Sequence, residues 1–224
     1  VLSSMGGPVS PFEMVTIFGA GLGPEKGLTA TLNEAGQAPR SVGGTRVLFD
    51  GLAAPVLFAQ SGQVNAIAPS SLGNRPATQM QIEYNGVLSD PVPLLVTPAT
   101  PGVFTIDGSG TGAAAVLNED GSANSPSNPA ARGSTVSIFA TGCGFMIPAG
   151  EDGHVAATPG RLRADLNVWI GAPATVTYAG PAPGLVYGVA QINARVPESA
   201  PAGSNVLVTL GISPRIDEAS NLRT

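Results

Sequence analysis

The feature that most constrains this chain is an internal repeat. Residues 9–23 match residues 130–144, and in each segment an apolar run opens into a Gly-x-Gly sequence. Further along, Gln-Val-Asn-Ala at residues 63–66 returns as Gln-Ile-Asn-Ala at residues 191–194. Self-similarity of this kind is the sequence signature of a repeated structural unit. The chain is therefore predicted to hold two copies of one small fold, with a boundary near residues 98–102.

Short runs of β-branched and aromatic residues predict that this fold is made of strands. Residues 45–49 and 166–170 are examples, and several such runs alternate polar with apolar residues. An alternation with a period of two buries one face of a strand. Asp-Gly at residues 50–51 and Asn-Gly at residues 85–86 favour tight hairpins between runs. Helical spacing is always interrupted by glycine or proline, so helices should be limited to single turns.

Frequent turns complete the prediction of an all-β fold class. The chain has 30 glycines and 21 prolines, and they are spread through segments rich in Val, Ile and Phe. Turn signals at intervals of roughly 8 to 12 residues are typical of antiparallel β-sandwiches. We therefore expect two tandem immunoglobulin-like antiparallel β-sandwiches of about seven strands each. The first would span residues 1–99 and the second residues 100–224.

The charge balance excludes two classes of partner. Only 11% of the residues are charged, and 10 Lys and Arg against 15 Asp and Glu give a net charge of −5. A nucleic-acid-binding protein needs a basic stripe to displace counterions from phosphates, and this sequence has none. No apolar run approaches the roughly 20 residues of a membrane-spanning helix. We expect no nucleic-acid partner and no membrane insertion.

The repeat resembles a known family. Its pattern is a Val-x-Ile-Phe strand (residues 15–18) opening into Gly-x-Gly, then Gln-Val/Ile-Asn-Ala, a proline turn and a closing hairpin. This pattern, with the linker at residues 118–130, resembles the Solibacter-type uncharacterised C-terminal domain family over nearly the whole chain. That family is similar to IPT/TIG immunoglobulin-like modules of large secreted bacterial proteins. The resemblance implies an extracellular or cell-surface location, and it supplies no catalytic residues.

The two copies differ at their ends. In the first copy, residues 91–96 form a plausible final strand after the last hairpin. In the second, the apolar run at residues 206–210 is followed by residues 211–224, which are polar and contain Pro214. A sandwich without its last strand exposes unpaired backbone groups and an uncovered apolar face, which favours accepting a strand from another chain.

This difference predicts self-assembly. A strand from the N-terminal region of a neighbouring subunit would complete the second sandwich and build a head-to-tail oligomer or filament. The residues expected to take part are Val1, Leu2 and Met5 on the donor side and Val206, Val208 and Leu210 on the acceptor side. The alternative is that the natural chain continues past Thr224 and supplies the strand itself.

Residues for catalysis or metal binding are few. His154 is the single histidine and Cys143 the single cysteine, too few for a zinc site. No Gly-x-Ser-x-Gly elbow is present, and Cys143 has no nearby cation to stabilise a thiolate. Calcium is the stronger metal candidate, because the acidic segments at residues 118–121 and 151–153 offer oxygen ligands on loops. Neither segment has the spacing of a calcium loop, and Asx turns explain both equally well. We therefore expect no enzyme activity, no metal and no cofactor.

Carbohydrate binding is an alternative function, because it uses exposed aromatic rings with polar neighbours. The candidates are Trp169, Tyr178 and Tyr187. Tyr187 lies in residues by which the second copy exceeds the first, so we expect it on the surface. Trp169 is expected in the core, as is common for the tryptophan of a small sandwich.

The paired Gln63/Asn65 and Gln191/Asn193 are expected to satisfy backbone groups of adjacent loops. The sequence as a whole predicts a non-enzymatic extracellular structural or adhesive protein that self-assembles. A carbohydrate-binding module and an accessory domain of a larger secreted enzyme are the alternatives.

Overall fold

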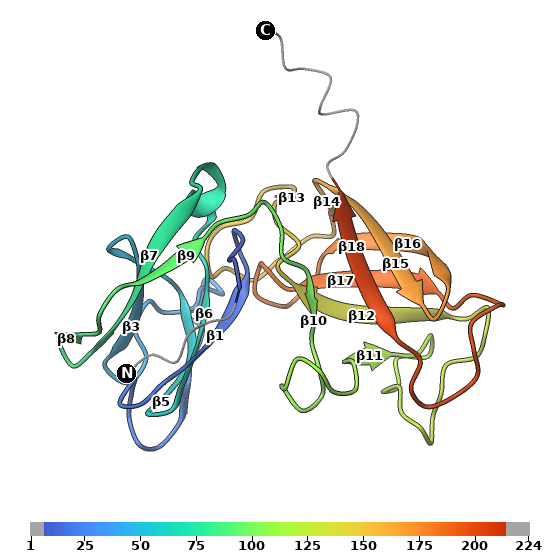
Figure 1. Cartoon of the computed structure of the whole chain (residues 1–224), viewed down its shortest axis with the longest axis horizontal. Helices are drawn as coiled ribbons and strands as arrows, with labels where there is room; N and C mark the ends of the chain where they lie inside the picture. Colours follow the sequence, from blue (N-terminus) through green and yellow to red (C-terminus); the bar gives the residue numbers. More distant parts are fainter. Residues whose placement is uncertain (1–6, 214–224) are drawn as a thin grey trace, which may run out of the picture.

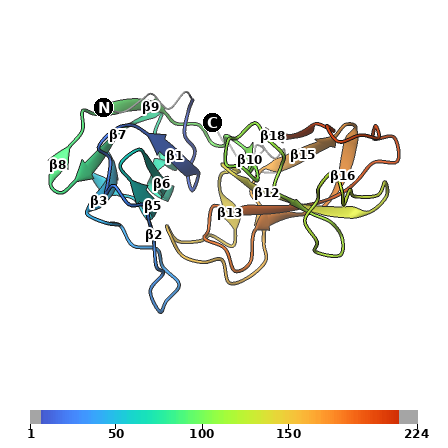
Figure 2. The ribbon, with the colours of Figure 1, turned by 90° about the horizontal axis from the view of Figure 1, so that it is seen from below.

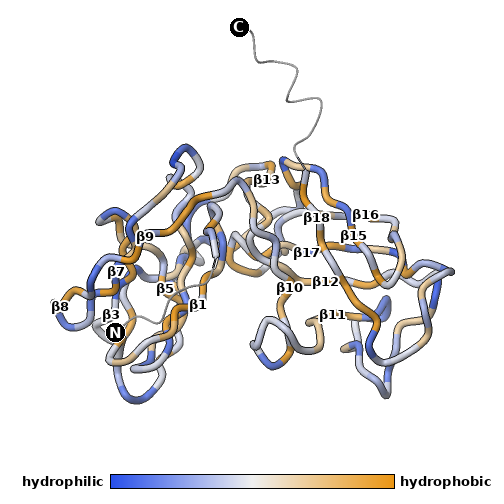
Figure 3. The backbone as a smooth tube through the Cα atoms, viewed as in Figure 1, coloured by the Kyte–Doolittle hydropathy of each residue, from blue (hydrophilic) through white to orange (hydrophobic). Residues whose placement is uncertain are grey.

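The computed structural model describes residues 7–213, and within that range the chain is all-β. Its regular elements are antiparallel strands and one 3₁₀ turn, η1 (Ser70–Asn74). Two halves lie side by side along the longest axis of the molecule (Figures 1 and 2). Apolar residues follow the strands, and hydrophilic residues gather at the turns between them (Figure 3).

The N-terminal half contains two sheets that face each other across one hydrophobic core. The first sheet has the order β1-β6-β5-β2, and the second has the order β4-β3-β7-β8, with β9 also paired to β7. Their bounds are β1 Met14–Phe18, β2 Leu28–Thr29, β3 Thr45–Phe49, β4 Leu52–Ala53, β5 Val56–Gln60, β6 Gln63–Ile67, β7 Ala77–Tyr84, β8 Val87–Leu88 and β9 Val92–Leu95. Ile17, Val47 and Val64 are fully buried between the sheets.

The C-terminal half has one larger sheet of order β10-β12-β17-β16-β15-β18, with β11 also paired to β12 and a separate β13-β14 pair. The bounds are β10 Gly102–Val103, β11 Val116–Leu117, β12 Thr135–Thr141, β13 Met146–Ile147, β14 Arg161–Leu162, β15 Asp165–Ile170, β16 Pro173–Pro181, β17 Ala190–Arg195 and β18 Val208–Ser213. The start of β16 pairs with β15 and the remainder pairs with β17. Strand β10 lies close to β18, so the sheet curls toward an incomplete barrel (Figure 1).

The sequence repeat is also a repeat of strand pairing. In β1 and β6, Ile17 lies opposite Val64, and in β12 and β17 the matching Ile138 lies opposite Ile192. Both copies also shift register at one bulge, between Val56 and Phe58 on β5 and between Val176 and Tyr178 on β16. A bulge re-aims the strand, and its recurrence indicates that both copies need the same bend.

Within residues 7–213, each half contains nine strands instead of the seven expected, because two-residue strands such as β2, β4 and β8 extend the sheets. The hairpins predicted at the Asp-Gly and Asn-Gly turns are confirmed. Asp50 and Asn85 each have a φ of 49° and connect β3 to β4 and β7 to β8. Asp and Asn tolerate this left-handed conformation better than other non-glycine residues.

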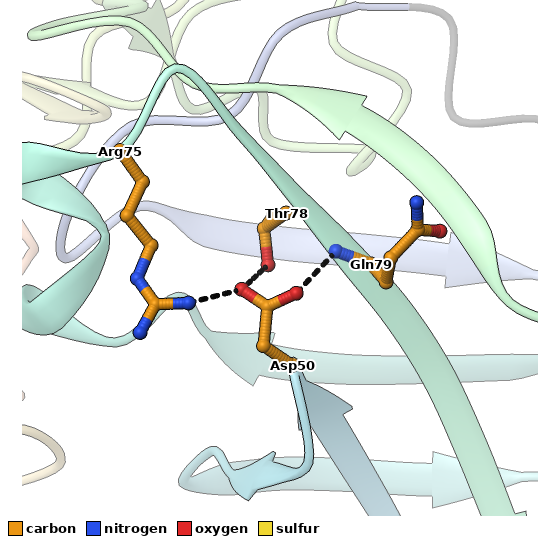
Figure 4. A network of polar contacts seen from close by, with 4 residues as sticks. All are labelled: Asp50, Arg75, Thr78 and Gln79. Atoms are coloured by element: carbon orange, nitrogen blue, oxygen red, sulfur yellow. Dashed lines mark hydrogen bonds and ion pairs between the residues drawn. The ribbon is translucent and has the colours of Figure 1, made fainter.

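Asp50 also ties its hairpin to β7. Its carboxylate accepts hydrogen bonds from the backbone N–H of Gln79 (2.9 Å) and the hydroxyl of Thr78 (2.8 Å), and it pairs with the Arg75 guanidinium at 2.7 Å (Figure 4). These contacts, the Gln79 N–H foremost, lower the pKa of Asp50. The network fixes the entry of β7 against the end of β3.

Candidate strand-accepting edge

The outer edge of β18 is the candidate functional site. Strand β18 pairs with β15 over six residues, from Ile170 opposite Val208 to Asp165 opposite Ser213. The corresponding pair in the N-terminal half is β3 with β7, where Phe49 lies opposite Met80. There β7 has a further neighbour, β9, in which Val92 lies opposite Met80. Within residues 7–213, β18 is the last strand of its sheet and pairs with β15 alone.

Burial shows what β9 contributes. The inward side chains of β7, Thr78, Met80 and Ile82, are at most 3% exposed. The residues at the equivalent places in the C-terminal half are Val206, Val208 and Leu210, which pack against the second core and are only partly buried. Strand β9 pairs with residues 77–80, so it lies beside Thr78 and Met80 and does not reach Ile82. Within residues 7–213, the apolar row of the second copy is thus less buried than its counterpart on β7.

The two edges also differ in their protection against pairing. Strand β9 carries Pro93, which has no N–H to offer a further strand, and Pro91 precedes it. Strand β18 carries no proline and no charged residue over Val208–Ser213. Proline and charge are the usual means by which an edge strand avoids adding another strand. The first edge is therefore blunted. The second lacks both protections, and in the described residues β10 lies close to β18 without pairing with it.

The site residues predicted from sequence fall into two groups. Val206, Val208 and Leu210 lie together on β18 and the segment leading into it, on the face turned toward the core. Val1, Leu2 and Met5 lie outside the described residues, so their part in the site stays a prediction.

The expectation that Tyr187 lies on the surface is wrong. The residue is 4% exposed, and its ring makes an edge-to-face contact with Phe12, with centroids 4.8 Å apart. Its hydroxyl donates to the Pro148 carbonyl at 3.1 Å, and burial raises its pKa. It lines an open recess of about 240 Å³ beside His154 and Glu151, whose Nε2 and Oε2 atoms are 3.4 Å apart.

The expectation that Trp169 lies in the core is also wrong. It is 41% exposed, on the outer face of β15 opposite Thr209. A Cβ built on Gly211 would lie 3.3 Å from Cζ3 of the indole, so the ring rests over that glycine of β18. The neighbouring Asn167 is exposed on the same face. The alternation in the sequence indicated that one face is buried but not which one.

The paired glutamines and asparagines have hydrogen-bond partners other than those expected. The Gln63 amide donates to Asn65 Oδ1 at 2.9 Å, and Gln191 donates to Asn193 Oδ1 at 2.9 Å. Each pair therefore bonds mainly side chain to side chain along its strand instead of to an adjacent loop. Ser137 adds a hydrogen bond to Asn193 at 3.0 Å. These residues stabilise the repeated pairing of neighbouring strands.

The candidate nucleophile is held in an inert state. Cys143 is buried, its thiol donates to the Thr141 carbonyl at 3.7 Å, and burial together with the charge of Glu13 raises its pKa to about 12. A thiol with that pKa stays protonated at neutral pH and is a weak nucleophile.

The acidic loops act as turns and as contacts. Asp120 accepts from the N–H and hydroxyl of Ser122, as in an Asx turn, and these bonds lower its pKa. Asp152 accepts from the Ser70 N–H of the N-terminal half at 2.9 Å. In the part of the chain that the structure describes, no three His, Cys, Asp or Glu side chains gather as metal ligands. The same part contains no helix long and apolar enough to cross a membrane.

The contact between the halves had no signal in the sequence. Phe12 precedes β1, yet its side chain belongs to the second core, where it meets Phe145 and Tyr187 edge to face. The neighbouring Glu13 carboxylate accepts hydrogen bonds from the Ser10 N–H (2.7 Å) and from the hydroxyl of Thr100 (2.5 Å). Phe12 of the N-terminal half thus packs in the second core, and Thr100 of the C-terminal half binds the Glu13 carboxylate.

Comparisons with known proteins identify no relative. No protein-family model matches the chain, and no curated protein matches it. The family resemblance described above stays a prediction, and any function has to be inferred from the geometry.

Proposed function

We propose that this protein is a non-enzymatic structural or adhesive module of the cell exterior, built from two immunoglobulin-like sandwiches. It assembles by adding a strand from a second copy along β18. The observation that carries this proposal is the partly buried row of Val206, Val208 and Leu210, whose counterparts on β7 are fully buried, two of them beside β9.

Adding a strand would both pair with the backbone of β18 and cover its apolar side chains. The added strand pairs with the backbone on the outer edge of β18, and its alternate side chains cover the apolar row. Burying apolar area contributes about 25 cal/mol per Å², so covering three aliphatic side chains is a substantial gain. Because the acceptor edge and the donor belong to different parts of the chain, the contact is heterologous. Its repetition produces a closed ring or an open filament, depending on the rotation between neighbouring copies.

The rest of the molecule is consistent with a structural role. Cys143 is a buried neutral thiol, and the Asp120 turn and the Asp152 contact use their carboxylates to hold the backbone. The recess is lined by His154, Glu151 and Tyr187, and the Tyr187 hydroxyl is already bonded to the Pro148 carbonyl.

The test is the assembly state of the whole chain. Light scattering after size exclusion and negative-stain electron microscopy should reveal oligomers or filaments that grow with concentration. Val206→Lys should abolish assembly, because an inward-pointing charge on an edge strand opposes pairing. Leu207→Lys is the matched control, since this side chain is 71% exposed and its replacement should leave assembly intact. A stable monomer at all concentrations would overturn the proposal.

Trp169 favours a second candidate function, binding of neutral carbohydrate. An exposed indole flanked by Asn167 and Thr209 offers a stacking face beside uncharged hydrogen-bonding groups. Trp169 is the single tryptophan, so its fluorescence reports directly on this face. Titration with a neutral oligosaccharide such as cellohexaose should shift the emission, and calorimetry should lose the binding heat in Trp169→Ala but keep it in Tyr187→Phe. Unchanged emission with no heat would exclude this candidate.

A further inference from the structure

We propose that the strand accepted by β18 is the segment Val1–Met5 of a second copy, antiparallel to β18, with Met5 opposite Val206. This inference rests on the proposed function and names its partner. The segment lies outside the described residues, and the pairing is inferred from its sequence and from the geometry of the acceptor edge.

The N-terminal half provides a template for the donor. Strand β9 runs antiparallel to β7, with Leu94 opposite Thr78 and Val92 opposite Met80. Leu94 is buried in the first core, and Val92 packs against it at the margin. A donor for β18 therefore needs a large apolar residue at the position of Leu94, side chains at alternate positions facing inward, and no charge on that face.

Two segments of the chain lie outside the described residues, and they differ in charge. Residues 1–6 read Val-Leu-Ser-Ser-Met-Gly and carry no charged side chain. Residues 214–224 carry Arg215, Asp217, Glu218 and Arg223. Charged side chains oppose the addition of a strand against an apolar row. The N-terminal segment is the donor that suits this edge.

One register fits both partners. If Met5 takes the place equivalent to Leu94, opposite Val206, then Ser3 lies opposite Val208 and Val1 lies opposite Leu210. Large residues then meet the two ends of the row, and the small serine meets its middle. Five extended residues span about 17 Å, long enough to cover the whole row.

The N-terminal half also indicates why its Val1–Met5 segment would pair with another copy and not with its own half. Val9 is held in its own N-terminal half, where its N–H bonds to Leu95 and its carbonyl accepts from Thr97, beside β9. The β7 edge of that half is already filled by β9. Gly6 and Gly7 precede the anchored Val9 and permit a change of chain direction. The segment before them is thus joined to a half whose edge is complete.

Cysteine cross-linking tests the donor and its register. Directly opposed residues of antiparallel strands place their Cβ atoms within about 5.5 Å, close enough for a disulfide after a small shift. The full-length Ser3→Cys/Val208→Cys variant, mildly oxidised, should lose its monomer band to a ladder of disulfide-linked oligomers that a reductant reverses. Cys143 is buried with a thiol pKa of about 12, so it does not compete.

Ser4→Cys/Val208→Cys is the matched control, because neighbouring residues of a strand face opposite sides. It should give no ladder. Equal ladders from both variants would overturn the register, and a disulfide within one chain would overturn the second copy as the source. If the parent chain assembles but neither variant cross-links, the donor is a different segment and the assembly proposal stands. If the parent chain stays monomeric, the assembly proposal itself fails.

Discussion

Glu13 is a titratable residue at the contact between the halves. Burial raises its pKa, while hydrogen bonds from the Thr100 hydroxyl and from Ser10 act in the opposite direction. No Lys or Arg pairs with it among the ion pairs of residues 7–213. Its carboxyl group therefore binds a proton more tightly in the folded protein than in the unfolded chain.

The stability of the protein should consequently fall as pH rises through the titration of Glu13. The folded state binds more protons in this window, so its advantage is complete below the ordinary glutamate pKa and is lost above the raised one. Glu13→Gln cannot ionise and should remove this part of the pH dependence. Thermal unfolding between pH 4 and pH 7.5 measures it, with the exposed Glu25→Gln as control. Parallel curves for Glu13→Gln and the parent would contradict the assignment.

The burial of two aromatic residues, Trp169 and Tyr187, was predicted wrongly from the sequence. The period-two pattern around Trp169 identified a strand with one buried face, and Val168 and Ile170 are buried. Which face turns inward depends on the partner sheet, which a local pattern does not contain. Tyr187 was misplaced for the same reason, since the ring that covers it, Phe12, is distant in sequence.

Strands were the most predictable elements because the repeat provided each pattern twice. The matches at residues 15–18 and 63–66 correspond to β1 and β6, which pair with each other. Their counterparts in the second copy, β12 and β17, pair in the same way. The 3₁₀ turn η1 agrees with the expected absence of longer helices in the described residues. Short strands such as β10 and β11 had no signal, because two residues are too few to establish a period.

The edge of β18 was partly predictable as well. The sequence predicted that the last apolar run of the second copy ends at residue 210, whereas β18 continues to Ser213 and Ile212 packs against the second core. The expected lack of a closing strand concerns residues after 213, which lie outside the described residues, so it stays a prediction. The unequal burial of Met80 and Val208 could not be read from sequence, because both residues are apolar and both lie in strand-like runs. Only the presence or absence of a neighbouring strand separates them.

At the scale of the molecule, Phe12 joins the two halves. Its N–H bonds to the Ala68 carbonyl of the first half at 3.0 Å, while its ring lies in the second core. Gly188 makes room for it, since a Cβ there would lie 2.1 Å from the Phe12 carbonyl oxygen. This glycine has a φ of 113°, which other residues seldom adopt.

Phe12→Ala should lower the free energy of unfolding by about 3 to 5 kcal/mol, the usual cost of removing a buried phenylalanine. It should also loosen the docking of the halves, which small-angle X-ray scattering detects as a larger radius of gyration. Phe18→Ala is the comparison, because Phe18 is half exposed and its loss should cost less than about 0.5 kcal/mol. Equal losses in the two variants would exclude a special role for Phe12.

Because the Phe12 ring packs in the second core, the C-terminal half depends on the N-terminal half for one of its core side chains. A fragment starting at residue 100 would contain every strand of its sheet and yet have a hole beside Tyr187 and Phe145. The second copy is therefore not interchangeable with the first, and it could not be transplanted alone into another protein without a substitute for that ring. In the described residues, the core of the C-terminal half thus includes a side chain that comes from the N-terminal half.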